Sequence, residues 1–189
     1  LQRQAGENVG IYSILQGNLS NPNYDLTFDI KGSYEIISRG IRLEMPSGSE
    51  KYAKNYRQQD PELIPKLVDG YSWADGDSIN SIYIKVTRMA GEDVGSYNYI
   101  ADYQEDSGNY RILSFETEEQ FVIRQGEAKI TSLSITQVTF GDNLATSTIY
   151  GSAVYLGQTV DGVFSWTNNR MQVDSMQYFA QIKFTPTDT

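Results

Sequence analysis

The chain has 189 residues, a formal net charge of −9 and a pI of about 4.5. A negative field of this size repels phosphate backbones, so we expect no nucleic-acid partner. The sequence contains neither cysteine nor histidine, which excludes disulfides, thiolate zinc sites and a Ser-His-Asp triad. No apolar run approaches the roughly 18 residues that a membrane-spanning helix needs, so we expect no membrane insertion by this chain.

The composition favours many short β-strands. The chain has 14 tyrosines and 16 glycines, whereas proline occurs 5 times. Aromatic and β-branched residues fit a pleated, half-buried surface, and clusters of Gly, Asn, Asp and Ser interrupt the apolar runs. We therefore predict an all-β fold of short strands joined by turns.

One ten-residue motif occurs twice. Residues 3–12 read RQAGENVGIY, and residues 88–97 read RMAGEDVGSY. Arg, Ala, Gly, Glu, Val, Gly and Tyr return in register after 85 residues, and such a fixed interval indicates tandem units. We call this pattern, RxAGExVGxY, the repeated motif.

The similarity between the two copies extends beyond the repeated motif. It predicts the second half of a first unit at 1–38, a complete second unit at 39–125 and a third β-unit at 126–189. The further matching stretches are 23–28 with 109–115, and 34–36 with 121–123.

Within each copy, a polar turn containing glycine precedes an apolar strand, over 10–14 and over 95–100. Period-two alternation also predicts strands at 24–28 and in the second part of 79–86. The third unit has a similar sequence pattern, in which apolar and aromatic runs alternate with turn residues. Those runs lie at 139–144, 162–166 and 178–186.

We expect the glycines and the glutamates of the repeated motif to have structural roles in its turn. Its glycines are expected to supply positive φ or a close backbone approach. Its glutamates are expected to cap the turn or lie at a strand edge rather than act as catalytic carboxylates. The glycines are Gly6, Gly10, Gly91 and Gly95, and the glutamates are Glu7 and Glu92.

On these motifs the second unit resembles the MBG domains ("mostly bacterial Ig", YDG type), which occur in tandem in large bacterial surface proteins. Residues 1–38 resemble the second half of another copy. Arg57 stands where the family pattern has a glycine. The motif segments are 54–63 (KNYRQQDPEL), the Gly-Asp turn 76–77, the repeated motif and Asn109-Tyr110.

Residues 126–189 are similar to bacterial Ig-like repeats with a YGxxL start, a GxFxW centre and an FTPTD end. The resemblance implies tandem small Ig-like β-sandwich units, the third of them lacking its last strand. It implies no catalytic, cofactor or metal-binding residues. The matching segments are 140–144 (FGDNL), 162–166 (GVFSW) and 184–188 (FTPTD).

The loop from Asp69 to Asp77 carries the densest set of carboxylates. Acidic residues at alternating positions beside glycine are one way to collect Ca²⁺, which takes six or more oxygen ligands. The spacing lacks the downstream acidic ligand of a calcium loop, and an Asp-Gly turn between strands explains it without metal. A second acidic cluster, Glu116 to Glu119, is interpreted as a solvated loop.

Three further kinds of site are weighed against structural roles. Six aromatic residues offer a platform for stacking sugar rings, or else they fill cross-strand pairs and contacts between units. Paired carboxylates suggest a glycosidase only if they face each other across a sugar-sized cleft. A Lys-to-Asn cross-link is chemically possible, but no sequence feature singles out a pair. The aromatics are Tyr71, Trp73, Tyr97, Tyr99, Tyr103 and Tyr110, and the carboxylate pairs are Asp75 with Asp77 and Glu92 with Asp93.

The sequence therefore predicts a non-catalytic stalk or spacer segment of a large bacterial surface or secreted adhesin-like protein. Its location is extracellular, at the cell surface or cell wall, and its main partners are neighbouring repeats. The alternative is a β-sandwich module that binds carbohydrate or protein, such as host or cell-wall glycan.

Overall fold

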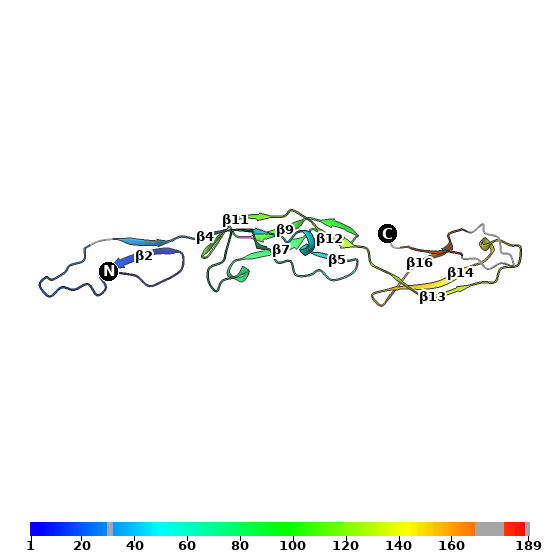
Figure 1. Cartoon of the computed structure of the whole chain (residues 1–189), viewed down its shortest axis with the longest axis horizontal. Helices are drawn as coiled ribbons and strands as arrows, with labels where there is room; N and C mark the ends of the chain where they lie inside the picture. The colour runs from blue at the N-terminus through cyan, green and yellow to red at the C-terminus, as the bar shows by residue number, and fades with distance from the viewer. Residues whose placement is uncertain (30–31, 169–179, 188–189) are drawn as a thin grey trace. The chain divides into compact units, whose positions relative to one another are not determined.

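The computed structural model describes residues 1–29, 32–168 and 180–187. These residues form β-strands, short 3₁₀ helices and connecting turns, so the predicted all-β fold is confirmed (Figure 1). The chain divides into two compact units, residues 1–124 and residues 125–189. The finer division into three repeats stays a prediction.

One sheet of the first unit has the strand order β10-β11-β4-β6. At its centre β4 (Arg39–Glu44) runs parallel to β11 (Tyr110–Glu116) (Figure 1). The short strand β6 (Lys66–Leu67) extends the sheet beyond β4, and β10 (Asp106–Ser107) forms a hairpin with β11. Alternate residues of the central strands are buried, as expected for a sheet with one face on the core.

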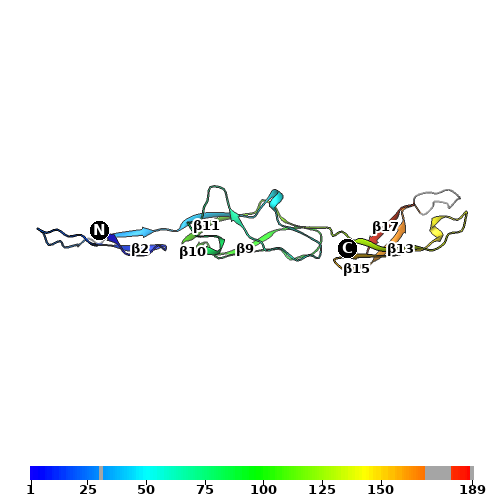
Figure 2. The same ribbon diagram turned by 60° about the horizontal axis from the view of Figure 1, so that its bottom comes forward.

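Five shorter strands form the facing layer. β7 (Ile84–Arg88) pairs with β9 (Tyr99–Tyr103), and β12 (Phe121–Arg124) lies between β5 (Ala53–Asn55) and β8 (Gly95–Tyr97). One residue separates β8 from β9. The turned view shows β9 and β11 in separate layers (Figure 2).

The core of this sandwich is an apolar cluster between the two layers. Ile41 and Leu43 of β4 and Tyr110 and Ile112 of β11 are almost fully buried. Each large apolar side chain removed from water stabilises the fold by about 1.5–3 kcal/mol. Half-buried side chains from the facing strands, from loops and from β11 itself close the cluster, among them Trp73, Ile82, Ile84, Tyr103 and Phe115.

Residues 1–36 reproduce part of this layer with the same pairing register. β1 (Gln2–Arg3), β2 (Gly10–Leu15) and β3 (Ser33–Ile36) form a three-stranded antiparallel sheet. The repeated positions pair alike in both copies, because each motif sits at the same place in its strands. The matching pairs are Arg3–Ile14 with Arg88–Tyr99, and Tyr12–Tyr34 with Tyr97–Phe121.

The strand predicted at 24–28 is not formed. Its counterpart in the second copy, β11, is held by its parallel neighbour β4, whereas no described strand lies beside 24–28. A strand without a neighbour leaves its backbone hydrogen bonds unmade, so alternation alone does not create one. The small bridge between Asn21 and Tyr24 nevertheless repeats the pairing of Ser107 with Tyr110.

The second unit contains two small sheets. β14 (Ile149–Tyr155) pairs with β13 (Lys129–Ile135) and β15 (Gln158–Val160), and β16 (Gly162–Trp166) pairs with β17 (Ile182–Pro186). The predicted run at 162–166 is thus a strand, whereas residues 178–179 of the last run lie outside the described residues. The 3₁₀ helices of the chain are η1 (Gly48–Glu50), η2 (Ile79–Ser81) and η3 (Leu144–Thr146).

Candidate functional site

The second copy of the repeated motif is organised around the guanidinium of Arg88, whose side chain is 6% exposed. Its Nη1 donates to the carbonyl oxygens of Met89, at 3.1 Å, and Gly91. Its Nη2 donates to Glu92 Oε1 at 2.6 Å. The ring centroid of Tyr97 lies 5.0 Å from the guanidinium carbon. One side chain therefore ties together the beginning, the turn and the end of the motif.

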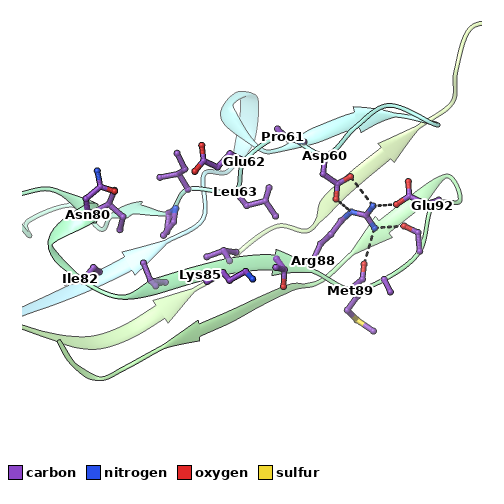
Figure 3. A pocket seen from close by; sticks show the side chains of 18 residues that line it. Asp60, Pro61, Glu62, Leu63, Asn80, Ile82, Lys85, Arg88, Met89 and Glu92 are labelled. Atoms are coloured by element: carbon purple, nitrogen blue, oxygen red, sulfur yellow. Dashed lines mark hydrogen bonds and ion pairs between the residues drawn. The ribbon is translucent and has the colours of Figure 1, made fainter. Parts of the chain in front are cut away.

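Three further charged side chains join Arg88. Its Nε and Nη2 bind both carboxylate oxygens of Asp60, at 2.8 and 3.1 Å (Figure 3). Lys54 Nζ lies 2.7 Å from Asp60 Oδ1 and 2.5 Å from Glu92 Oε2. We name Lys54, Asp60, Arg88 and Glu92 the Arg88 cluster. Each cation in it contacts both carboxylates.

The elements of the sandwich place these four residues together. Arg88 ends β7, and Glu92 lies in the turn that follows it. Lys54 is the middle residue of β5, and Asp60 lies in the loop after that strand. Phe121 of β12 contributes a second ring, 5.2 Å from the guanidinium. The stem of Lys54 is buried, and its charge is balanced by the two carboxylates.

Electrostatics keeps the cluster ionised. The hydrogen bond from Arg88 holds the pKa of Asp60 below its ordinary value, although burial opposes this. The bond from Lys54, with that from Arg88, likewise lowers the pKa of Glu92. Burial acts to lower the pKa of Lys54, but the bonds to Asp60 and Glu92 together raise it.

This ionisation decides what the cluster can do chemically. Lys54 and Asp60 are close enough to condense to an amide, but that reaction requires a neutral amine and a neutral acid. The shifts above favour the charged forms of both groups. The partner of Lys54 is also an aspartate rather than the asparagine considered from sequence. The Arg88 cluster is therefore an ion-pair network that connects strands.

Arg3 makes the same contacts in the first copy. Its Nη1 donates to the carbonyl oxygen of Gly6, and its Nη2 pairs with Glu7. The guanidinium carbon lies 5.7 Å from the ring centroid of Tyr12 and 5.6 Å from that of Tyr34. Tyr34 takes the place that Phe121 holds in the second copy. Glu7, like Glu92, lies between two strands and binds the motif arginine.

The tyrosine that ends the motif closes the turn from the other side. Tyr12 Oη donates to the carbonyl oxygen of Asn8 at 2.7 Å, and Tyr97 Oη donates to that of Asp93 at 2.7 Å. The two hydrogen bonds span the same four residues in each copy. Together the arginine and tyrosine contacts account for the spacing of the repeated motif.

The first glycine of each motif is required by this geometry. Gly6 and Gly91 have φ of +146° and +144°, values that L side chains rarely adopt. A Cβ atom at either position would overlap the ring of the motif tyrosine, Tyr12 or Tyr97. The expectation of positive φ and close approach is confirmed for both glycines.

The second glycine differs between the copies. Gly10 has φ of +158°, close to extended backbone. Gly95 lies in β8 without positive φ, and a Cβ there would meet no atom within 4 Å. The prediction for Gly95 was therefore wrong, because its backbone has the ordinary conformation of a strand.

The acidic loop from Asp69 to Asp77 is closed by Tyr110. Tyr110 Oη donates to Asp77 Oδ2 at 2.6 Å and accepts from the backbone N–H of Ala74 at 2.8 Å. Ser81 Oγ donates to the other oxygen of Asp77 at 3.0 Å. Asp-Gly turns occur at 69–70 and 75–76. Within the described residues, no three acidic side chains gather in a way that could hold a metal ion.

The cluster from Glu116 to Glu119 is only partly the solvated loop that was predicted. Glu116 is the last residue of β11 and accepts a hydrogen bond from Ser114. Glu119 pairs with Lys51 Nζ at 3.0 Å and accepts from the backbone N–H of Gly48 at 3.1 Å. Glu116 also lies 3.8 Å from Arg42 Nε of β4, so two of these carboxylates connect β11 and the following turn to neighbouring segments.

Of the six aromatic residues, Tyr110 is buried and the other five are half-buried. Tyr110 is 1% exposed, and Trp73 packs edge-on against it with ring centroids 5.1 Å apart. Tyr103 packs on Phe115 at 6.4 Å, and Tyr97 covers Arg88. Tyr71, Trp73, Tyr103 and Tyr110 thus belong to the core of the sandwich, the structural role weighed against a sugar platform. Of the carboxylates considered for a glycosidase, one of each pair is engaged, because Glu92 and Asp77 are bound by neighbouring side chains.

A groove of about 750 Å³ lies beside the Arg88 cluster, and sequence reasoning did not find it (Figure 3). Its walls are β7 and the extended segment 60–65. Asp60, Arg88 and Glu92 lie at one end (Figure 3). The groove has the size of a small-molecule site, but the charges at this end already neutralise each other.

The comparison with known proteins concerns the first copy of the repeated motif. Residues 1–35 match the family model of the MBG domain (YGX type). The matched type is YGX, whereas the motifs led us to expect the YDG type. No curated protein and no solved structure matches the chain. No helix of the described residues is long and apolar enough to cross a membrane. The match supports a module of the kind found in bacterial surface proteins.

Proposed function

We propose that the chain is a non-catalytic spacer segment of a bacterial cell-surface or secreted protein, built from MBG-like repeats and located outside the cell. The observation that carries this proposal is a set of contacts that recurs in both copies of the motif. In each copy the arginine side chain binds the carbonyl oxygen of the first glycine and the glutamate, and it stacks on the tyrosine. We call this set of contacts the arginine clasp. Its donors and acceptors are used inside the protein, by the motif itself and by Lys54 and Asp60, as expected for a folding element rather than a ligand site.

A contact between the two copies supports neighbouring repeats as partners. Asn109 Oδ1 accepts from the backbone N–H of Val9 at 2.9 Å, and its Nδ2 donates to Asn8 Oδ1 at 3.1 Å. Asn8 belongs to the first copy of the motif, and Asn109 follows the second. In an array, hydrogen bonds of this kind would limit bending between consecutive repeats.

Small-angle X-ray scattering on the purified chain tests the spacer role, with the mass checked by light scattering. A single compact body of this length has a radius of gyration of roughly 16 Å. A spacer predicts a clearly larger value at monomer mass, no saturable glycan binding and no Ca²⁺-dependent change in melting temperature. A monomer with the compact value would contradict it.

The groove beside the Arg88 cluster favours a second candidate, a module that binds glycan or protein. Lys85 and Glu62 line it with exposed side chains that have no ion-pair partner among the described residues. If the groove binds, a glycan or host-protein array gives a saturable signal that Lys85→Ala weakens. The control is Lys129→Ala, at an exposed position in β13 of the other unit.

A further inference from the structure

The first copy of the repeat presents an unfinished core. In the second copy, β12 lies between β8 and β5, and β11 lies beside β4. The first copy has β3 in place of β12 and residues 24–28 in place of β11. Among the described residues, nothing takes the places of β4 and β5 beside them.

Side-chain exposure shows the consequence. Phe121 is 0% exposed and Tyr110 is 1% exposed. Their counterparts in the first copy, Tyr34 and Tyr24, are 50% and 71% exposed. Residues that form the core in one copy are thus left open in the other, and the open face keeps the residue types of a core.

The first copy also holds half of an ion-pair cluster. Arg88 and Glu92 are completed by Asp60 and Lys54, which come from β5 and its following loop. Arg3 and Glu7 pair with each other, and among the described residues no lysine and no second carboxylate joins them. Within the described part of the chain, the first copy therefore lacks a lysine and an aspartate corresponding to Lys54 and Asp60, the two charged residues that β5 and its following loop supply in the second copy.

We propose that the face formed by β2, β3 and residues 24–28 binds the opening half of another repeat, a polypeptide segment of the same kind as residues 38–63. Its first strand lies beside 24–28, as β4 lies beside β11. Its second strand runs parallel to β3, as β5 runs parallel to β12.

The pairing register of β5 with β12 also predicts where the bound segment carries its charged residues. In the second copy, Lys54 lies opposite Ile123. Ile36 holds the position of Ile123, so the occupant places a lysine opposite Ile36 and within reach of Glu7. An aspartate six residues after that lysine reaches Arg3, as Asp60 reaches Arg88. This inference rests on the proposed repeat organisation but not on the spacer role.

A peptide with the sequence of residues 38–63, labelled with fluorescein, tests the proposal against the full chain by fluorescence anisotropy. We expect saturable binding of one peptide per chain. The same peptide carrying Lys54→Ala and Asp60→Ala binds at least about tenfold more weakly, because charged hydrogen bonds are lost. A peptide with Gln59→Ala, at an exposed position outside the cluster, keeps the affinity.

Two further measurements locate the peptide. Arg3→Ala in the full chain weakens the binding of the unchanged peptide, and hydrogen exchange slows at the amides of residues 33–36. Slowing at residues 121–124 instead would mean that the peptide has replaced the chain's own β5, and this would overturn the proposal.

The absence of saturable binding would also overturn the proposal, as would equal affinity of the wild-type and doubly substituted peptides. A chain that forms dimers and excludes the peptide would show that a second copy covers the face. A large radius of gyration together with a failed peptide titration would leave the spacer role intact and remove only this inference.

Discussion

The guanidinium carbon of Arg88 lies 5.0 Å from the ring centroid of Tyr97, nine residues further along the chain. The corresponding distance from Arg3 to Tyr12 is 5.7 Å. Stacking of this kind adds about 0.5–2 kcal/mol and holds the two ends of the turn together. The repeated motif is therefore a physical unit that occurs twice in the chain, in which the arginine contacts the first glycine, the glutamate and the tyrosine.

The glycines of the second motif provide a test with an internal control. Gly91→Ala forces a side chain onto φ of +144° and into the ring of Tyr97, so we expect a loss of about 2 kcal/mol in the free energy of unfolding. Gly95→Ala meets open space in a strand and leaves stability nearly unchanged. Urea denaturation of the two variants measures the difference, and equal losses would contradict the geometry.

Tyr110→Phe tests the closure of the acidic loop. The change removes hydrogen bonds to Asp77 and Ala74 in a nearly buried position, so we expect a loss of about 1–3 kcal/mol in thermal or urea unfolding. Tyr83→Phe is the matched control, because its hydroxyl binds Asp102 at the exposed surface and its removal has a much smaller effect. Similar losses in both variants would show that burial of the Tyr110 hydroxyl is unimportant.

The Arg88 cluster predicts a dependence of stability on acid pH. The folded chain lowers the pKa of Asp60 and Glu92 from ordinary values of 3.8 and 4.5. These carboxylates therefore stabilise the fold above those values, and the contribution is lost as pH falls through the lower folded values. We expect the melting temperature to fall as the pH drops below these ordinary values. Asp60→Asn should flatten this drop, and an unchanged slope in that variant would contradict the assignment.

The parts of the fold that could be predicted from sequence are those set by local pattern. Apolar runs bounded by glycine-containing turns indicated the strands at 10–14 and 162–166, and the motif interval indicated the corresponding positions of Arg3 and Arg88. Positive φ at Gly6 and Gly91 also followed, because the motif combines glycine with a polar turn.

The parts that could not be predicted depend on distant neighbours. Residues 24–28 alternate like a strand but lack the partner that β4 gives to β11. Lys54 and Asp60 stand in the quoted motif, yet only the parallel pairing of β5 with β12 brings them to Arg88. Arg57, which stands where the family pattern has a glycine, adopts a left-handed conformation with φ of +60°.

The central claim is that the repeated motif is a stabilising clasp. Its most direct test is the free energy of unfolding of Arg88→Ala, followed by the fluorescence of Trp73 in a chain whose other tryptophan, Trp166, is replaced by Phe. Removing a nearly buried arginine from two carboxylates should cost about 3 kcal/mol. Arg3→Ala, which breaks the same clasp without the Lys54 and Asp60 partners, should cost less. An Arg88→Ala chain as stable as the parent would contradict the claim.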